Sequence, residues 1–203
     1  MFCLKTETDS AWADAVISDL DGLIVDHAHC EMKAASNALA LAARHPDNPA
    51  IVRALVALAA EELEHFQTVF ALIERRNLTL RTPRIDAYAA DLRRITGELP
   101  RGKASGVVDR LLIAALIEAR SAERFKLIIG ALKKSGTEPE LLSMYEAFFP
   151  QEARHYRVYV DLAIAAAHGD EGAVYERLES LADCEAKVVR RLAKSDARAS
   201  MHG

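Results

Sequence analysis

The sequence predicts an all-α protein whose core is a four-helix bundle. The composition favours helix, because 51% of the 203 residues are hydrophobic whereas only 9 are Gly and 6 are Pro. Four long segments carry apolar side chains at steps of three and four, which is the period of one helical face. No segment alternates apolar and polar residues as a half-buried strand does. A chain of this length can bury a full core, so we expect a single domain over residues 1–203.

Turn residues locate each helix along the chain. From the N-terminus, the predicted helices span residues 10–18, 21–44, 49–76, 85–95, 107–134, 139–168 and 173–194. The sequence HPDNP separates the first two long helices, SGTEP separates the last two, and HGD precedes the final helix. The long stretch between the second and third long helices contains Pro and Gly, which predicts a crossover connection. We expect the tail from about 196 to 203 to fray.

Composition also excludes several classes of protein. No stretch is long and apolar enough to span a membrane, and the N-terminus lacks a charged-then-apolar signal pattern. The three cysteines are far apart and form no CxxC motif, so neither a disulfide framework nor a cysteine metal site is expected. We therefore expect a soluble cytoplasmic protein with reduced thiols and no membrane partner.

Each long helix has a carboxylate in the middle of its apolar stripe. In the second long helix, Glu62 and His65 follow the same spacing as Leu55, Leu58 and Val69. The corresponding residues of the other three long helices are Glu31, Glu118, and the pair Glu152 and His155. Such positions normally face a core, where an unpartnered ionised carboxylate costs several kcal/mol.

Two metal ions would neutralise four carboxylates in one layer. A single Glu on each of two helices and Glu-x-x-His on each of the other two is the ligand pattern of di-iron and di-manganese bundles. The three-residue step places Glu and His on one helical face, within reach of one ion. A ligand set without thiolate favours iron or manganese over structural zinc. We expect the ligands to be Glu31, Glu62, His65, Glu118, Glu152 and His155.

Other polar residues near these stripes have simpler interpretations. Glu123 is the alternative to Glu118, but it lies five residues further on, about 140° around the helix. We expect it to face away and to pair with Arg120 or Lys126 at helical spacing. His27 and His29 are interpreted as hydrogen-bonded helix residues rather than ligands, although His27 lies one turn before Glu31. The tyrosines of the fourth long helix are expected to pack in the core or at its rim: Tyr145, Tyr156 and Tyr159.

Four segments together resemble a known family. DHAHCEMKAASNAL, EELEHF, EARSAERF and QEARHY are similar to the tRNA 2-methylthio-N6-isopentenyladenosine hydroxylases, over nearly the whole chain. The Glu-x-x-His pairs occur throughout the ferritin-like superfamily, whereas DHAHCE and EARSAERF are more specific. The resemblance implies a ferritin-like four-helix bundle with extra terminal helices. This chain departs from the family pattern at two positions, neither of which is a proposed ligand. Met32 stands where the family has Lys, and Ala122 stands where it has Cys.

The resemblance also implies an activity. Members of this family are non-haem di-iron monooxygenases that use O2 and an external electron donor to hydroxylate the isopentenyl group on adenosine 37 of tRNA. It implies two iron ions held by the six residues named above, and an electron-donor protein or reductase as partner. In related sites the residue before each Glu-x-x-His supports the histidine of the other pair. Here these residues are Glu61 and Gln151, and the neutral Gln151 makes the two sides unequal.

A tRNA substrate must be reconciled with a net charge of −4. Two divalent ions would bring the metal-loaded protein close to neutral. Binding of tRNA would then depend on local patches of positive charge. Between residues 75 and 103 there are eight cations against three anions, an excess that could contact phosphates. The cations are Arg75, Arg76, Arg81, Arg84, Arg93, Arg94, Arg101 and Lys103. A solvated loop is the competing interpretation.

Three other functions fit part of the pattern. A ferroxidase for iron storage or for iron and peroxide detoxification would use the same di-metal centre, in a closed multi-subunit shell. A rubrerythrin-like peroxidase would normally carry an additional cysteine-rich metal module. A helical interaction protein with a vestigial site would bind no metal.

Overall fold

The computed structural model describes residues 2–83, 87–99 and 106–193. All regular secondary structure in these ranges is helical, as predicted. The helices are α1 (Ser10–Ile17), α2 (Leu20–Ala43), α3 (Pro49–Arg75), α4 (Ala87–Gly97), α5 (Gly106–Ser135), α6 (Pro139–Ala166) and α7 (Glu171–Leu192). Every predicted helix is present with ends within two residues of those expected. The tail that we expect to fray lies outside the described residues.

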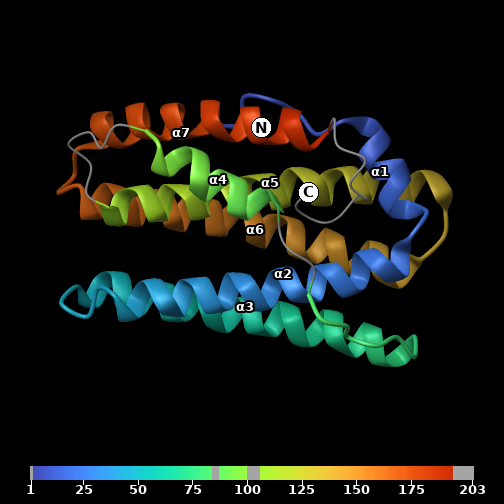
Figure 1. Cartoon of the computed structure of the whole chain (residues 1–203). Coiled ribbons are helices and arrows are strands. Elements are labelled where there is room, and N and C mark those ends of the chain that lie inside the picture. Colours follow the sequence, from blue (N-terminus) through green and yellow to red (C-terminus); the bar gives the residue numbers. More distant parts are fainter. Residues whose placement is uncertain (1, 84–86, 100–105, 194–203) are drawn as a thin grey trace. The chain divides into compact units, whose positions relative to one another are not determined.

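The helices group into two compact units. One comprises Ser18–Ile85, and the other comprises Met1–Ile17 with Asp86–Gly203. We call them the α2/α3 unit and the α5/α6 unit. Figure 1 shows that α2 and α3 run side by side along their length, and that α5 and α6 do the same. Among the described residues, none of these helices combines the length and apolar character needed to cross a lipid bilayer.

The α2/α3 unit is a helical hairpin with well-defined ends. Asn48 is the N-cap of α3, and its side-chain oxygen accepts the N–H of Ile51 at 3.1 Å. After α3, Asn77 adopts a left-handed conformation with φ of 54°. This lets the N–H of Leu78 donate to the carbonyl of Ile73 at 3.0 Å, which closes the helix end. These local signals fix where α3 starts and stops.

The α5/α6 unit contains a second long hairpin. A short loop joins the two helices, and Gly136 within it has φ of 66°, where glycine is strongly favoured. Aromatic side chains pack between the helices. The ring centroid of Phe125 lies 5.0 Å from that of Tyr145 and 6.5 Å from that of Phe148. All three side chains are buried. The tyrosine therefore packs in the core, as expected.

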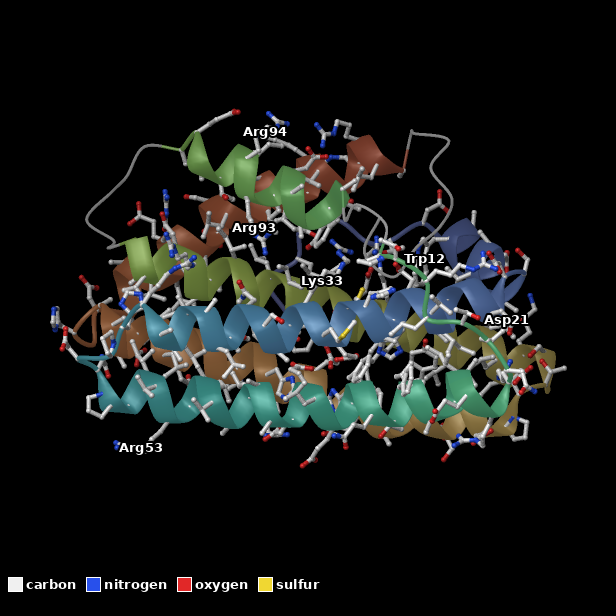
Figure 2. All side chains as sticks on the ribbon, turned by 60° about the horizontal axis from the view of Figure 1, so that its bottom comes forward. Trp12, Asp21, Lys33, Arg53, Arg93 and Arg94 are labelled. Carbon is white, nitrogen blue, oxygen red and sulfur yellow. The ribbon has the colours of Figure 1, made fainter. Side chains whose placement is uncertain are left out.

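Three shorter elements complete the α5/α6 unit. Helix α1 packs on α5, and α4 packs on α7. Trp12 on α1 is labelled in Figure 2. The buried guanidinium of Arg124 lies over its ring, 5.0 Å from the ring centroid. Burial first, and then the charge of Arg120, lower the pKa of Arg124 to about 10. This contact links the N-terminal helix to the middle of α5.

Candidate metal centre

The α2/α3 unit brings together three of the predicted ligands. Glu31 on α2 meets Glu62 and His65 on α3, and all three side chains are buried, with at most 4% of each residue exposed. Nδ1 of His65 lies 3.3 Å from Oε2 of Glu62 and 3.6 Å from Oε2 of Glu31. The possible ligand atoms of the three residues all lie within 4.8 Å of one another. Two carboxylates and one imidazole therefore converge on a volume of the size that one ion requires.

The periodicity of α3 explains this arrangement. Leu55, Leu58 and Val69 are buried on the same stripe as the Glu62 and His65 pair. Because residues three and four apart share a helical face, packing the apolar side chains against α2 forces the polar pair inward as well. The sequence pattern thus determines which side chains enter the site.

His27 is hydrogen-bonded within α2, as expected from the sequence. Its Nε2 lies 2.5 Å from Oε1 of Glu31, one turn further along α2, and only 1% of the histidine is exposed. Burial raises the pKa of Glu31, but the charge and hydrogen bond of His27, with the neighbouring His65, outweigh burial and hold this pKa well below its usual range. Glu31 is therefore ionised at neutral pH, and the His27 N–H is the donor. The neighbouring His29 instead donates to the carbonyl of Arg81 at 2.6 Å.

The α5/α6 unit contains the other three predicted ligands. Glu118 on α5 meets Glu152 and His155 on α6, and at most 5% of each residue is exposed. Their possible ligand atoms also lie within 4.8 Å of one another. Each unit thus supplies two carboxylates and one imidazole from one pair of helices. We call these two groups the α2/α3 triad and the α5/α6 triad.

Helix α6 contains a proline just before its triad residues. Pro150 lies inside the helix, where it has no N–H to donate and its ring crowds the preceding turn. The side-chain amide of the next residue, Gln151, donates to the carbonyl of Ala147 at 3.2 Å. Gln151 therefore bonds to the backbone of its own helix, one turn back. Glu61, the corresponding residue of α3, is half-buried.

Glu123, the alternative to Glu118, has a different set of partners. Its carboxylate accepts the backbone N–H and hydroxyl of Thr8, at 2.7 and 2.6 Å, and the guanidinium of Arg120 at 2.8 Å. Arg120 is fully buried and also donates to both carboxylate oxygens of Glu185 on α7, at 2.9 and 3.0 Å. Glu123 therefore faces away from the triad and fastens the N-terminal segment to α5. The expected pairing with Arg120 at helical spacing is present.

The cations expected to contact RNA are only partly covered by the structure. Those within the described residues are Arg75, Arg76, Arg81, Arg93 and Arg94; those outside are Arg84, Arg101 and Lys103. In the α2/α3 unit, Arg76 lies 3.7 Å from Asp21, whereas Arg75 and Arg81 are exposed. In the α5/α6 unit, Arg93 and Arg94 lie on α4 (Figure 2), where both are exposed and Arg94 pairs with Glu98 at 3.1 Å.

The sequence of this chain matches a known protein family. The sequence profile described as tRNA-(MS[2]IO[6]A)-hydroxylase (MiaE) matches residues 1–202. The chain belongs to this family. It is 36% identical over 187 residues to a tRNA 2-(methylsulfanyl)-N(6)-isopentenyladenosine(37) hydroxylase of Pseudomonas putida, covering 92% of this chain and 86% of that one. A hydroxylase of the same name from Salmonella typhimurium is 32% identical over 114 residues, covering 56% of this chain and 39% of that one.

A solved structure is similar to this family member over its whole length. It is described as protein 43 with aldehyde deformylating oxygenase activity, from Synechococcus. The TM-score is 0.85 at 33% sequence identity, with 100% of this chain and 96% of the other covered. The predicted all-α, ferritin-like fold class is thereby confirmed, and so is the resemblance on which the expected hydroxylase chemistry rests.

The chemistry of each triad suits the metals of this fold class. Buried carboxylates that lie within 4.8 Å of one another repel unless a cation lies between them. Carboxylate oxygen and imidazole nitrogen, without thiolate, are ligands that suit iron or manganese. The residues of each triad therefore fit a bound iron or manganese ion.

Proposed function

We propose that this protein is an O2-dependent non-haem di-iron monooxygenase that hydroxylates the isopentenyl group of 2-methylthio-N6-isopentenyladenosine at position 37 of tRNA. The observation that carries the proposal is the family match over residues 1–202. The two buried triads support it, because each offers the carboxylate and imidazole ligands that a di-iron hydroxylase needs. The proposal treats residues 1–203 as one domain.

The ligands in this proposal are the six residues of the two triads: Glu31, Glu62, His65, Glu118, Glu152 and His155. When bound, two irons would relay two electrons from the external donor to O2, so that one oxygen atom enters an allylic C–H bond and the other leaves as water with two protons. The protein holds the ligands in place and keeps bulk water away, since all six side chains are buried. An external donor protein or reductase provides the electrons, and the tRNA substrate implies a cytoplasmic location.

Recognition of tRNA is proposed to use the basic stretch between residues 75 and 103. Phosphate contacts by Lys and Arg contribute most of the affinity of such complexes and make it depend on salt. Four arginines of this stretch are exposed, Arg75 and Arg81 in one unit and Arg93 and Arg94 in the other, and the proposal assigns phosphate contacts to them. Arg84, Arg101 and Lys103 belong to the same stretch of sequence and lie outside the described residues.

The decisive test is nucleoside analysis of modified tRNA. Reduced, iron-loaded protein is mixed with O2 and tRNA that carries 2-methylthio-N6-isopentenyladenosine, and the digest is examined by mass spectrometry. We expect one added oxygen on this nucleoside, labelled when ¹⁸O2 is used, and no product from a Glu62→Ala variant. Oxidation of iron without a hydroxylated nucleoside would instead support the ferroxidase alternative and refute the hydroxylase.

A further inference from the structure

The two triads differ in the residue that lies one helical turn before the glutamate contributed by α2 or by α5. On α2 this residue is His27, four residues before Glu31, and its ring nitrogen lies 2.5 Å from Oε1 of that carboxylate. On α5 the residue four positions before Glu118 is Ala114, which is also buried. Because a methyl side chain cannot donate a hydrogen bond, Glu118 has no counterpart of the His27 contact at this position.

The two carboxylate oxygens of Glu31 contact different residues. Oε1 accepts the hydrogen bond from His27, whereas Oε2 lies 3.6 Å from Nδ1 of His65. His65 in turn lies 3.3 Å from Glu62, so Oε2 points into the α2/α3 triad. Because His27 is buried in the core with 1% exposure, its ring has little freedom to turn away.

We propose that His27 is a positioning residue that holds one oxygen of Glu31 and turns the other towards the metal, which makes the two metal positions inequivalent. The proposal rests on the proposed function, since it assumes that Glu31 and Glu118 both bind metal. Hydrogen-bonding partners behind metal ligands fix ligand orientation, and their loss typically weakens metal binding about 10- to 100-fold. We assign that role to His27 on α2 and to no corresponding histidine on α5.

The experiment compares iron binding in three variants with that of the wild-type protein. The apo-proteins are titrated with Fe(II) without oxygen in the presence of a competing chelator, and ⁵⁷Fe-loaded samples are examined by Mössbauer spectroscopy. We expect wild-type protein to bind two irons in two distinguishable environments. His27→Ala should weaken one iron about 10- to 100-fold and alter one of the two spectral components. His27→Gln keeps a donor one turn before Glu31 and should restore most of the loss.

His29→Ala is the matched control. His29 is also a buried histidine of α2, but its hydrogen bond goes to the carbonyl of Arg81 rather than to a proposed ligand. It should keep both irons at wild-type affinity. Should His27→Ala not fold, as judged by circular dichroism, His27→Leu removes the donor while filling the space, and the same loss is expected.

The outcomes separate this proposal from the proposed function. Wild-type iron affinity in His27→Ala or His27→Leu refutes the positioning role and leaves the di-iron centre intact. Equal loss of iron in His29→Ala also refutes it, because the effect is then general damage to α2. A wild-type protein that binds no iron refutes the proposed function and this inference with it.

Discussion

Two glutamates on one helix should have opposite effects when each is replaced by glutamine. Glu118 and Glu123 are both buried on α5, and they are five residues apart. Glu118 belongs to the α5/α6 triad, whereas Glu123 binds Thr8 and Arg120. We expect Glu118→Gln to lose metal without losing stability, and Glu123→Gln to lose stability without losing metal.

The size of the stability effect follows from the contacts of Glu123. Its carboxylate accepts two hydrogen bonds from Thr8 and one from Arg120, and hydrogen bonds to charged groups contribute about 1.5–3 kcal/mol each. Glutamine keeps one acceptor oxygen, and Arg120 keeps its pairing with Glu185. We therefore expect a loss of about 3 kcal/mol. At about 2–4 °C per kcal/mol for a domain of this size, the melting temperature should fall by about 6–12 °C.

Glu118→Gln should behave differently in the metal-free protein. It removes one of two buried carboxylates whose ligand atoms lie within 4.8 Å, and so relieves their repulsion. The melting temperature of the apo-protein should stay the same or rise, while the loaded protein should retain less than two irons per chain. Circular dichroism melting of the apo-proteins and elemental analysis after loading measure the two effects. Loss of metal in Glu123→Gln alone would show that Glu123, and not Glu118, is the metal ligand on α5.

Two further predictions concern pH and RNA. Burial raises the pKa of Glu123, but the hydrogen bonds of Thr8 and the charge of Arg120 outweigh it and hold this pKa below its ordinary value of 4.5. The stabilisation from its charge should thus be complete above pH 4.5 and disappear as the pH falls through the lowered pKa, so the melting temperatures of wild type and Glu123→Gln should converge in acid. Replacing Arg93 and Arg94 by Glu should weaken tRNA binding and flatten its salt dependence at unchanged iron content; unchanged binding in a filter assay would leave them as solvated arginines.

The sequence alone determined the helices and the residues on their inner faces. For α3, the predicted span of 49–76 differs from Pro49–Arg75 by one residue, because the cap at Asn48 and the turn at Asn77 act locally. The helical period also predicted that Glu62 and His65 are buried, since their neighbours at three and four residues are apolar. Local signals of this kind depend on residues within one or two turns, so a single sequence reveals them.

Which partners the polar side chains find depends on the packing of segments that are distant in the sequence. The helical spacing left Arg120 and Lys126 as alternative partners for Glu123, and the structure selects Arg120. Two residues that are distant in the sequence complete this cluster. Thr8 binds Glu123 from 115 residues away, and Glu185 binds Arg120 from 65 residues away. Spacing likewise placed His27 one turn before Glu31, but the role of that pair depends on α3 bringing His65 to the other carboxylate oxygen. A local period fixes the face on which a side chain lies. Its hydrogen bonds depend on which distant segment packs against that face, and the packing of the whole unit determines that.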